Sequence, residues 1–154
     1  MESRTDDGSP RPYRVLVVDD NLDLLAAVRF ALLGEFEVET VTSAEDALEH
    51  LDHLSGPDRP DCLVVDVRMP GLNGVQLVRI LRGDPETAQI PLIILSAYAQ
   101  DEDVLRGMFA GVDQYLAKPF NLETLVAAIH WAVRQSPEER MARLRDLADR
   151  EGGF

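Results

Sequence analysis

Five residues that suit phosphoryl chemistry lie at the ends of short apolar runs in the sequence. Three are carboxylates, one is a hydroxyl and one is an amine: Asp19, Asp20, Asp66, Ser96 and Lys118. Clustered carboxylates repel one another, and a hard divalent cation relieves that repulsion. An aspartate can also act as a nucleophile that accepts a phosphoryl group. If the fold brings these residues together, they favour metal-assisted transfer of a phosphoryl group to aspartate, because such catalysis depends on positioning and charge neutralisation.

The pattern of apolar residues predicts the elements that would position these side chains. Short β-rich runs predict five strands, at residues 14–18, 37–41, 62–65, 91–95 and 114–117. Longer segments with helical spacing alternate with them, at residues 21–33, 43–54, 75–81, 101–110 and 121–134. Strands that alternate with helices pair in parallel, with helices on both faces of the sheet. We therefore expect an α/β fold with a doubly wound five-stranded parallel sheet.

The expected sheet allows the proposed chemistry to be tested, because it predicts where the five polar residues should lie. In open parallel sheets the working site lies at the carboxyl ends of the strands. With the strand order 2-1-3-4-5, the first, third, fourth and fifth strands are neighbours. All five polar residues then meet at one edge of the sheet.

Length and composition limit the classes of function. The chain has 154 residues and a formal net charge of −13, so it lacks the basic character of a nucleic-acid-binding protein. No stretch reaches 18 consecutive apolar residues, and no apolar signal segment precedes the first strand. Cys62, the only cysteine, lies in an apolar run and suits a reducing compartment. We expect a cytoplasmic protein that binds neither nucleic acid nor membrane.

The chain divides into three parts. Residues 1–12 are polar and predict a flexible arm, and residues 13–134 contain all the predicted strands and form one domain. In residues 135–154, Ser136 suits a helix N-cap, Pro137 the first helical position and Glu139 the capping-box position. This pattern predicts an extra C-terminal helix. We expect no DNA-binding output domain within these 154 residues, and the alternative that the natural chain continues into such a domain stays open.

Four motifs resemble the receiver domain of two-component response regulators, the CheY-like family with a flavodoxin-like fold. They are VVDD at 17–20, VVDVRMPGLNG at 64–74, LSA at 95–97 and YLAKPF at 115–120. Together they follow the predicted strands in the family's order, and the resemblance covers roughly residues 13–134.

The resemblance implies a role for each residue of the site. Asp66 resembles the phosphoacceptor. Asp19 and Asp20 resemble the family's metal-binding acids, so the resemblance implies that Asp20 binds Mg²⁺ or Mn²⁺ directly and that Asp19 binds it through water. The main-chain carbonyl of Arg68 completes the implied metal site. Lys118 resembles the lysine that contacts the phosphoryl group. The peptide bond between Lys118 and Pro119 corresponds to one that is usually cis in this family.

The resemblance also implies how phosphorylation is transmitted. Ser96 and Tyr115 resemble the switch pair: the hydroxyl moves towards the phosphoryl group and the tyrosine turns inwards. The face formed by the fourth helix, fifth strand and fifth helix then changes shape. The implied partners are a histidine kinase or histidine phosphotransfer protein, a downstream effector protein, and a second copy of the chain bound through that face. Such a protein assists its own phosphorylation and dephosphorylation but is not a conventional enzyme.

Two classes of enzyme fit these residues less well than a receiver domain does. A haloacid-dehalogenase-like phosphatase needs a second aspartate two residues after the nucleophile, where this chain has Arg68. A nucleotide enzyme is disfavoured because neither GxxxxGK[ST] nor GxGxxG follows the first strand. A degenerate receiver that serves as a phosphorylation-independent binding scaffold remains an alternative.

Further expectations concern residues around the site and on the surface. We expect the side chains of Arg68 and Tyr98 to influence the rate of dephosphorylation, because they border the site. His50, His53 and His130 lack ligand partners at useful spacing and are interpreted as surface residues, not as phosphodonors or metal ligands.

Overall fold

The sheet has the predicted topology. The computed structural model describes residues 11–101, 103, 112–135, 138–139, 142 and 145–146. Its strands are β1 Tyr13–Val18, β2 Phe36–Val41, β3 Cys62–Asp66, β4 Leu92–Ser96 and β5 Gln114–Ala117. They form one sheet in the order β2-β1-β3-β4-β5, and all four pairings are parallel. The predicted α/β fold and strand order are confirmed.

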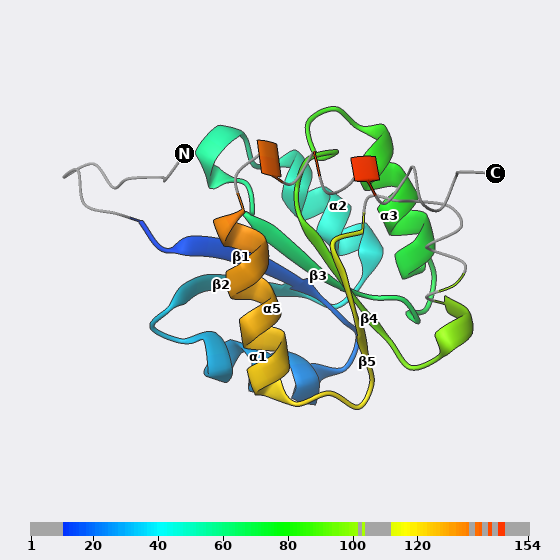
Figure 1. Ribbon diagram of the computed structural model, residues 1–154. Helices are drawn as coiled ribbons and strands as arrows, with labels where there is room; N and C mark the ends of the chain where they lie inside the picture. The colour runs from blue at the N-terminus through cyan, green and yellow to red at the C-terminus, as the bar shows by residue number, and fades with distance from the viewer. Residues whose placement is uncertain are drawn as a thin grey trace.

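Helices cover both faces of this sheet. They are α1 Leu22–Leu32, α2 Ala44–Asp52, α3 Gly74–Gly83 and α5 Leu122–Arg134, with a short 3₁₀ turn, η1, at Gly56–Asp58. α1 and α5 lie against one face, and α2 and α3 lie against the other (Figure 1). Of the predicted helix at 101–110, the described residues Asp101 and Asp103 are helical, and the rest lies outside the described residues.

Two apolar clusters, one on each face, hold the layers together. One joins β1, β3 and β4 to α2 and α3, and the other joins the opposite face of the same strands to α1 and α5. Every residue of β3 and β4 is buried, as expected for central strands of a parallel sheet covered on both faces. Cys62 is among them, in agreement with the prediction of a buried thiol.

Polar caps start the helices soon after the strands end. The side chains of Asn21, Ser43, Asn73 and Asn121 each accept a hydrogen bond from a backbone N–H in the first turn of α1, α2, α3 and α5. The cap at Ser43 agrees with the helix that the sequence predicts from residue 43. These early helix starts keep the loops after β1 and β3 short and place their residues at one edge of the sheet.

The ends of the chain are described only in part. Residues 1–10 of the predicted arm lie outside the described residues, whereas the Arg11 guanidinium contacts the Pro57 carbonyl and lies 4.0 Å from Asp58 Oδ1. In the predicted C-terminal extension, Glu138, Glu139, Ala142, Arg145 and Asp146 are helical, and the other residues after Gln135 lie outside the described residues. No helix within the described residues is long and apolar enough to cross a membrane.

Candidate functional site

Three carboxylates converge at the carboxyl edge of the sheet. Asp19 and Asp20 follow β1, Asp66 ends the neighbouring strand β3, and one oxygen from each lies within 4.8 Å of the others. Asp19 and Asp66 are buried, whereas Asp20 is exposed. Such a group of oxygen ligands with one open side suits a hard cation that keeps some of its water. The geometry therefore fits the magnesium site expected from the sequence.

Lys118 closes the acidic cluster from the other side. It follows β5, and its Nζ lies 3.1 Å from Asp19 Oδ2 and 3.3 Å from Asp66 Oδ1. Its backbone N–H donates to the Ser96 carbonyl at 2.7 Å, which fixes its position relative to β4. The peptide bond between Lys118 and Pro119 is cis, as the resemblance implied.

Asp66 and Lys118 influence each other's protonation. Burial raises the pKa of Asp66 to about 6, and the negative charge of Asp19 acts in the same direction, while Lys118 partly offsets both. Burial opposes the charged form of Lys118, but the neighbouring carboxylates of Asp66 and Asp19 outweigh it and raise the pKa of the amine. Asp66 therefore holds a proton more tightly than an ordinary aspartate, and a cation bound beside it would favour its ionised form.

The loop after Asp66 is held in place at its end and near its middle. At Gly74 a Cβ atom would lie 2.5 Å from the Asp66 carbonyl oxygen and 2.6 Å from Val67 Cα, so only glycine fits against the end of β3. Near the middle, Gly71 has a φ of +75°, and the Leu72 N–H donates to Glu45 Oε1 at 2.7 Å. This loop carries Arg68, whose carbonyl is the expected fourth protein ligand of the metal. Glu45 was not anticipated, because nothing in the sequence links α2 to this loop.

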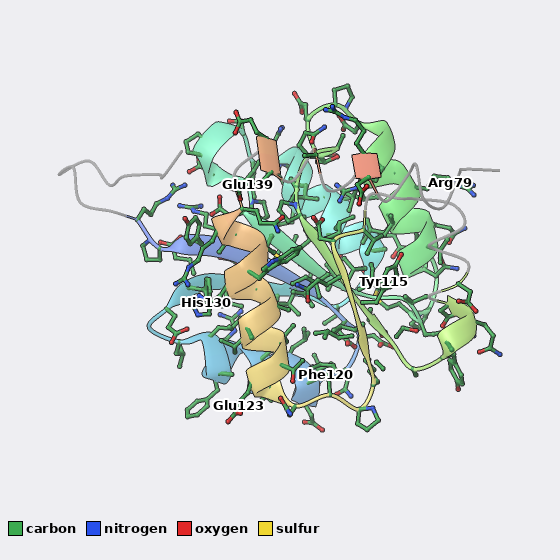
Figure 2. The ribbon with its side chains drawn as sticks, in the orientation of Figure 1. Arg79, Tyr115, Phe120, Glu123, His130 and Glu139 are labelled. Atoms are coloured by element: carbon green, nitrogen blue, oxygen red, sulfur yellow. The ribbon has the colours of Figure 1, made fainter. Side chains whose placement is uncertain are left out.

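Ser96 and Tyr115 lie on neighbouring strands near the site. The Ser96 side chain is buried, and its hydroxyl donates to the Tyr98 carbonyl at 2.7 Å. Tyr115 is half-buried and packs against the cluster that joins the sheet to α2 and α3 (Figure 2). The fold thus brings Ser96 to the correct edge, with its hydroxyl bonded to its own loop. The role of the two residues as a switch stays a prediction.

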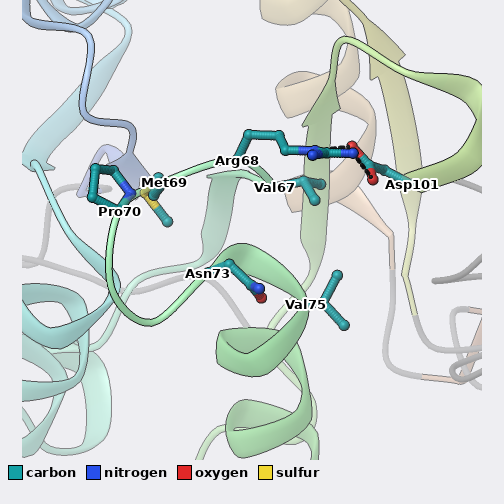
Figure 3. Close-up of a pocket in the computed structure, with 7 residues that line it drawn as sticks. All are labelled: Val67, Arg68, Met69, Pro70, Asn73, Val75 and Asp101. Atoms are coloured by element: carbon teal, nitrogen blue, oxygen red, sulfur yellow. Dashed lines mark hydrogen bonds and ion pairs between the residues drawn. The ribbon is translucent and has the colours of Figure 1, made fainter.

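A contact that the sequence did not reveal lies beside the site. The Arg68 guanidinium makes two hydrogen bonds to Asp101, from Nε to Oδ2 at 2.9 Å and from Nη2 to Oδ1 at 3.0 Å (Figure 3). Its Cζ also lies 4.8 Å from the centre of the Tyr98 ring. Arg68 and Tyr98 therefore touch, and their expected influence on dephosphorylation stays a prediction. Asp101 is 33 residues from Arg68, so sequence spacing alone could not pair them.

One of the three histidines makes contacts that the sequence did not indicate. His130 on α5 is half-buried, its Nε2 lies 2.9 Å from Glu35 Oε2, and its ring packs 4.8 Å from that of Phe36 (Figure 2). This contact joins α5 to the turn before β2, and the sequence did not indicate it. His130 serves as a link between these elements and lies outside the acidic cluster.

Comparisons with known proteins agree with this geometry. Residues 15–130 match the family model described as the response regulator receiver domain. The phosphate regulon transcriptional regulatory protein PhoB of Rhizobium meliloti is 33% identical over 139 residues, which cover 90% of this chain and 60% of that protein. The response regulator MprA of Mycobacterium tuberculosis is 39% identical over 129 residues, covering 84% of this chain and 54% of that protein.

Solved structures show the same fold. A putative response regulator from Chloroflexus aurantiacus is 31% identical with a TM-score of 0.71, covering 81% of this chain and all of that one (100%). The chemotaxis response regulator CheY4 of Vibrio cholerae is 28% identical with a TM-score of 0.70, covering 79% of this chain and 99% of that one. The chain thus spans a whole domain of the structural neighbours but only 54% to 60% of the two curated relatives.

Proposed function

Because this chain belongs to the family of response regulator receiver domains, we propose that it is a phosphoacceptor switch of a two-component system whose acceptor is Asp66. One observation carries the proposal: the Lys118 amine lies 3.1 Å from Asp19 and 3.3 Å from Asp66, beside three converging carboxylates. An acceptor carboxylate, a cation site and a fixed ammonium group are the parts that a phosphoryl transfer needs.

The residues at the site suit Mg²⁺ or Mn²⁺. Asp19, Asp20, Asp66 and the main-chain carbonyl of Arg68 would hold the ion, which supplies positive charge to neutralise phosphoryl oxygens. Both oxygens of Asp19 already accept protein hydrogen bonds, one from the Asn21 N–H at 2.9 Å and one from Lys118 at 3.1 Å. The Asp20 side chain is exposed. This difference supports direct binding through Asp20 and water-mediated binding through Asp19.

The phosphoryl donor in this proposal is a phosphohistidine of a histidine kinase or phosphotransfer protein. An ionised oxygen of Asp66 bonds to phosphorus while the phosphorus–nitrogen bond of the donor breaks. The electron pair leaves with the imidazole, which takes up a proton from solvent. Lys118 pairs with one phosphoryl oxygen and the Ser96 hydroxyl donates to another. Since the acceptor is part of the chain itself, the protein is a switch rather than a conventional enzyme.

Transmission of the signal follows from the position of Ser96. Its hydroxyl leaves the Tyr98 carbonyl for the phosphoryl group, and Tyr115 moves into the space beside it. The face that includes β5 and α5 then changes and controls protein partners. A nearly complete shift between two such states needs about 5.5 kcal/mol of differential stabilisation, which a new doubly charged group beside a cation is able to supply.

The output proposed here is binding of other proteins in the cytoplasm. The transcriptional role in the printed name of the Rhizobium relative belongs to that protein, of which this chain covers 60%. The described residues contain the receiver fold. A protein that binds the face including β5 and α5 would respond to a change in that face.

Intact-mass measurement after incubation with acetyl phosphate and Mg²⁺ tests the function. We expect the parent protein to gain one phosphoryl group, and we expect neither the Asp66→Asn protein nor the parent in excess EDTA to gain it. Lys118→Ala should take up the group much more slowly, by roughly 10²-fold or more, as is typical when a charge-stabilising donor is removed. A parent protein that stays unmodified would favour the alternative of a phosphorylation-independent scaffold.

A further inference from the structure

The Arg68 side chain is held at the border of the acidic site by two neighbours. Asp101 binds its guanidinium through two hydrogen bonds at 2.9 and 3.0 Å, and the Tyr98 ring lies under it at 4.8 Å. Figure 3 shows the guanidinium extended from the loop after β3 towards Asp101, above a hollow lined by Val67 and Val75. A planar guanidinium engaged on both sides in this way has one preferred orientation.

The same neighbours are tied to Ser96. The Tyr98 carbonyl accepts hydrogen bonds from the Ser96 hydroxyl at 2.7 Å and from the Asp101 backbone N–H at 3.1 Å. The Tyr98 backbone N–H in turn lies 3.3 Å from Ser96 Oγ. The segment from Ser96 to Asp101 is therefore one hydrogen-bonded unit, and Arg68 is attached to its far end.

The backbone of Arg68 lies close to the carboxylate of Asp66, the proposed acceptor. Its backbone N–H lies 3.4 Å from Asp66 Oδ1, and its side chain is 61% exposed, whereas the Asp101 side chain is only 13% exposed. A phosphoryl group on Asp66 would add nearly two negative charges beside this loop. Arginine binds phosphate and carboxylate in the same two-pronged geometry, so the phosphoryl group and Asp101 compete for one guanidinium.

We infer that Arg68 is a further phosphoryl-binding residue and that Asp101 is a positioning residue that holds its guanidinium away from Asp66. This inference rests on the proposed function, since it concerns the phosphoryl group on Asp66. When Arg68 turns to that group, the segment from Ser96 to Asp101 loses its tie to the loop after β3. Binding of the Ser96 hydroxyl and of Arg68 to the same group then frees both ends of this segment together.

A double-mutant cycle with beryllofluoride, a phosphoryl mimic, tests the inference. The dissociation constant would be measured by calorimetry in saturating Mg²⁺ for the parent, Asp101→Ala, Arg68→Ala and the double variant. We expect Asp101→Ala to bind the mimic about fivefold more tightly than the parent, because a freed guanidinium gains a partly exposed charge-assisted contact. In the Arg68→Ala protein, adding Asp101→Ala should leave the dissociation constant for beryllofluoride unchanged.

Two further variants keep the test decisive. Asp101→Asn retains the shape of the side chain without its charge and should also bind more tightly. Asp103→Ala removes an exposed aspartate two residues after Asp101 and should bind like the parent. Unchanged or weaker binding by both Asp101 variants, or an equal gain in the Arg68→Ala background, would overturn the inference. A parent protein that does not bind the mimic would instead overturn the proposed function.

Discussion

At the scale of single residues, the electrostatics of Asp66 lead to a pH-dependent stability. Its folded pKa of about 6 lies above the ordinary value of 3.8, because burial and Asp19 disfavour the carboxylate. The folded protein therefore binds a proton more tightly here than the unfolded chain does. Ionised Asp66 therefore lowers the free energy of unfolding. This destabilisation is fully present above pH 6 and disappears as the pH falls from about 6 to below 4.

Replacing Asp66 with asparagine should reveal this destabilisation. In metal-free buffer at pH 7.5 we expect Asp66→Asn to increase the free energy of unfolding by about 1–3 kcal/mol, since one pKa unit corresponds to about 1.4 kcal/mol. The gain should vanish near pH 4. Urea denaturation at several pH values measures it. Saturating Mg²⁺ provides the control, because it stabilises the parent more than a variant that lacks one ligand. A pH-independent difference would contradict the assignment.

Residue positions in the site could be predicted from the sequence, but side-chain orientations could not. Asp19, Asp66 and Lys118 follow directly from strand ends, and parallel strands share one carboxyl edge, so their convergence was predictable. The pairing of Arg68 with Asp101 joins two loops that lie 33 residues apart in sequence, and the direction of the Ser96 hydroxyl depends on the conformation of its own loop. Charge patterns within one segment carry no information about such contacts.

At the scale of elements, the junction between β3 and α3 depends on Gly74. A methyl group there would lie 2.5 Å from the Asp66 carbonyl and 2.6 Å from Val67 Cα, which are backbone atoms that cannot move aside cheaply. We expect Gly74→Ala to destabilise the fold by about 2–4 kcal/mol. It should also weaken Mg²⁺ binding, because α3 and the loop that carries Arg68 would shift. Thermal unfolding and metal titration measure the two effects.

Gly83 supplies a matched control at the other end of α3. A Cβ atom there would meet no atom within 4 Å, and its φ is not in the left-handed region. Gly83→Ala should therefore be neutral or stabilise the protein by up to about 1 kcal/mol, through a smaller loss of backbone entropy. Similar destabilisation by both substitutions would show that the close approach at Gly74 is not the cause.

The regular elements were predicted better than the connections between them. Continuous apolar runs in β3 and β4 and the cap at Ser43 are local signals, and the structure confirms them. The 3₁₀ turn at Gly56–Asp58 and the pairing of His130 with Glu35 were missed. Each involves a turn that contacts a distant part of the chain: Arg11 lies beside Asp58, and His130 lies beside Glu35. The local sequence of such a turn does not determine its structure.

At the scale of the whole molecule, self-association is expected through a face that includes β5 and α5. The strand order leaves β5 at an edge, next to β4 alone. On α5, Trp131 is 37% exposed and lines a hollow with His130 and Arg134. This face is the one that the proposed switch would alter, since Tyr115 lies on β5.

We therefore expect a weak homodimer through the fourth helix, β5 and α5 that forms on phosphorylation. Light scattering of the parent protein should give a monomer mass without beryllofluoride and an increasing mass with beryllofluoride and Mg²⁺. Since each copy carries a net charge of −13, two copies repel, and raising the salt concentration should strengthen the dimer by screening. Asp66→Asn should remain monomeric throughout. A monomer in every condition would contradict the predicted dimer, whereas a dimer that weakens with added salt would place attractive charge pairs at the interface.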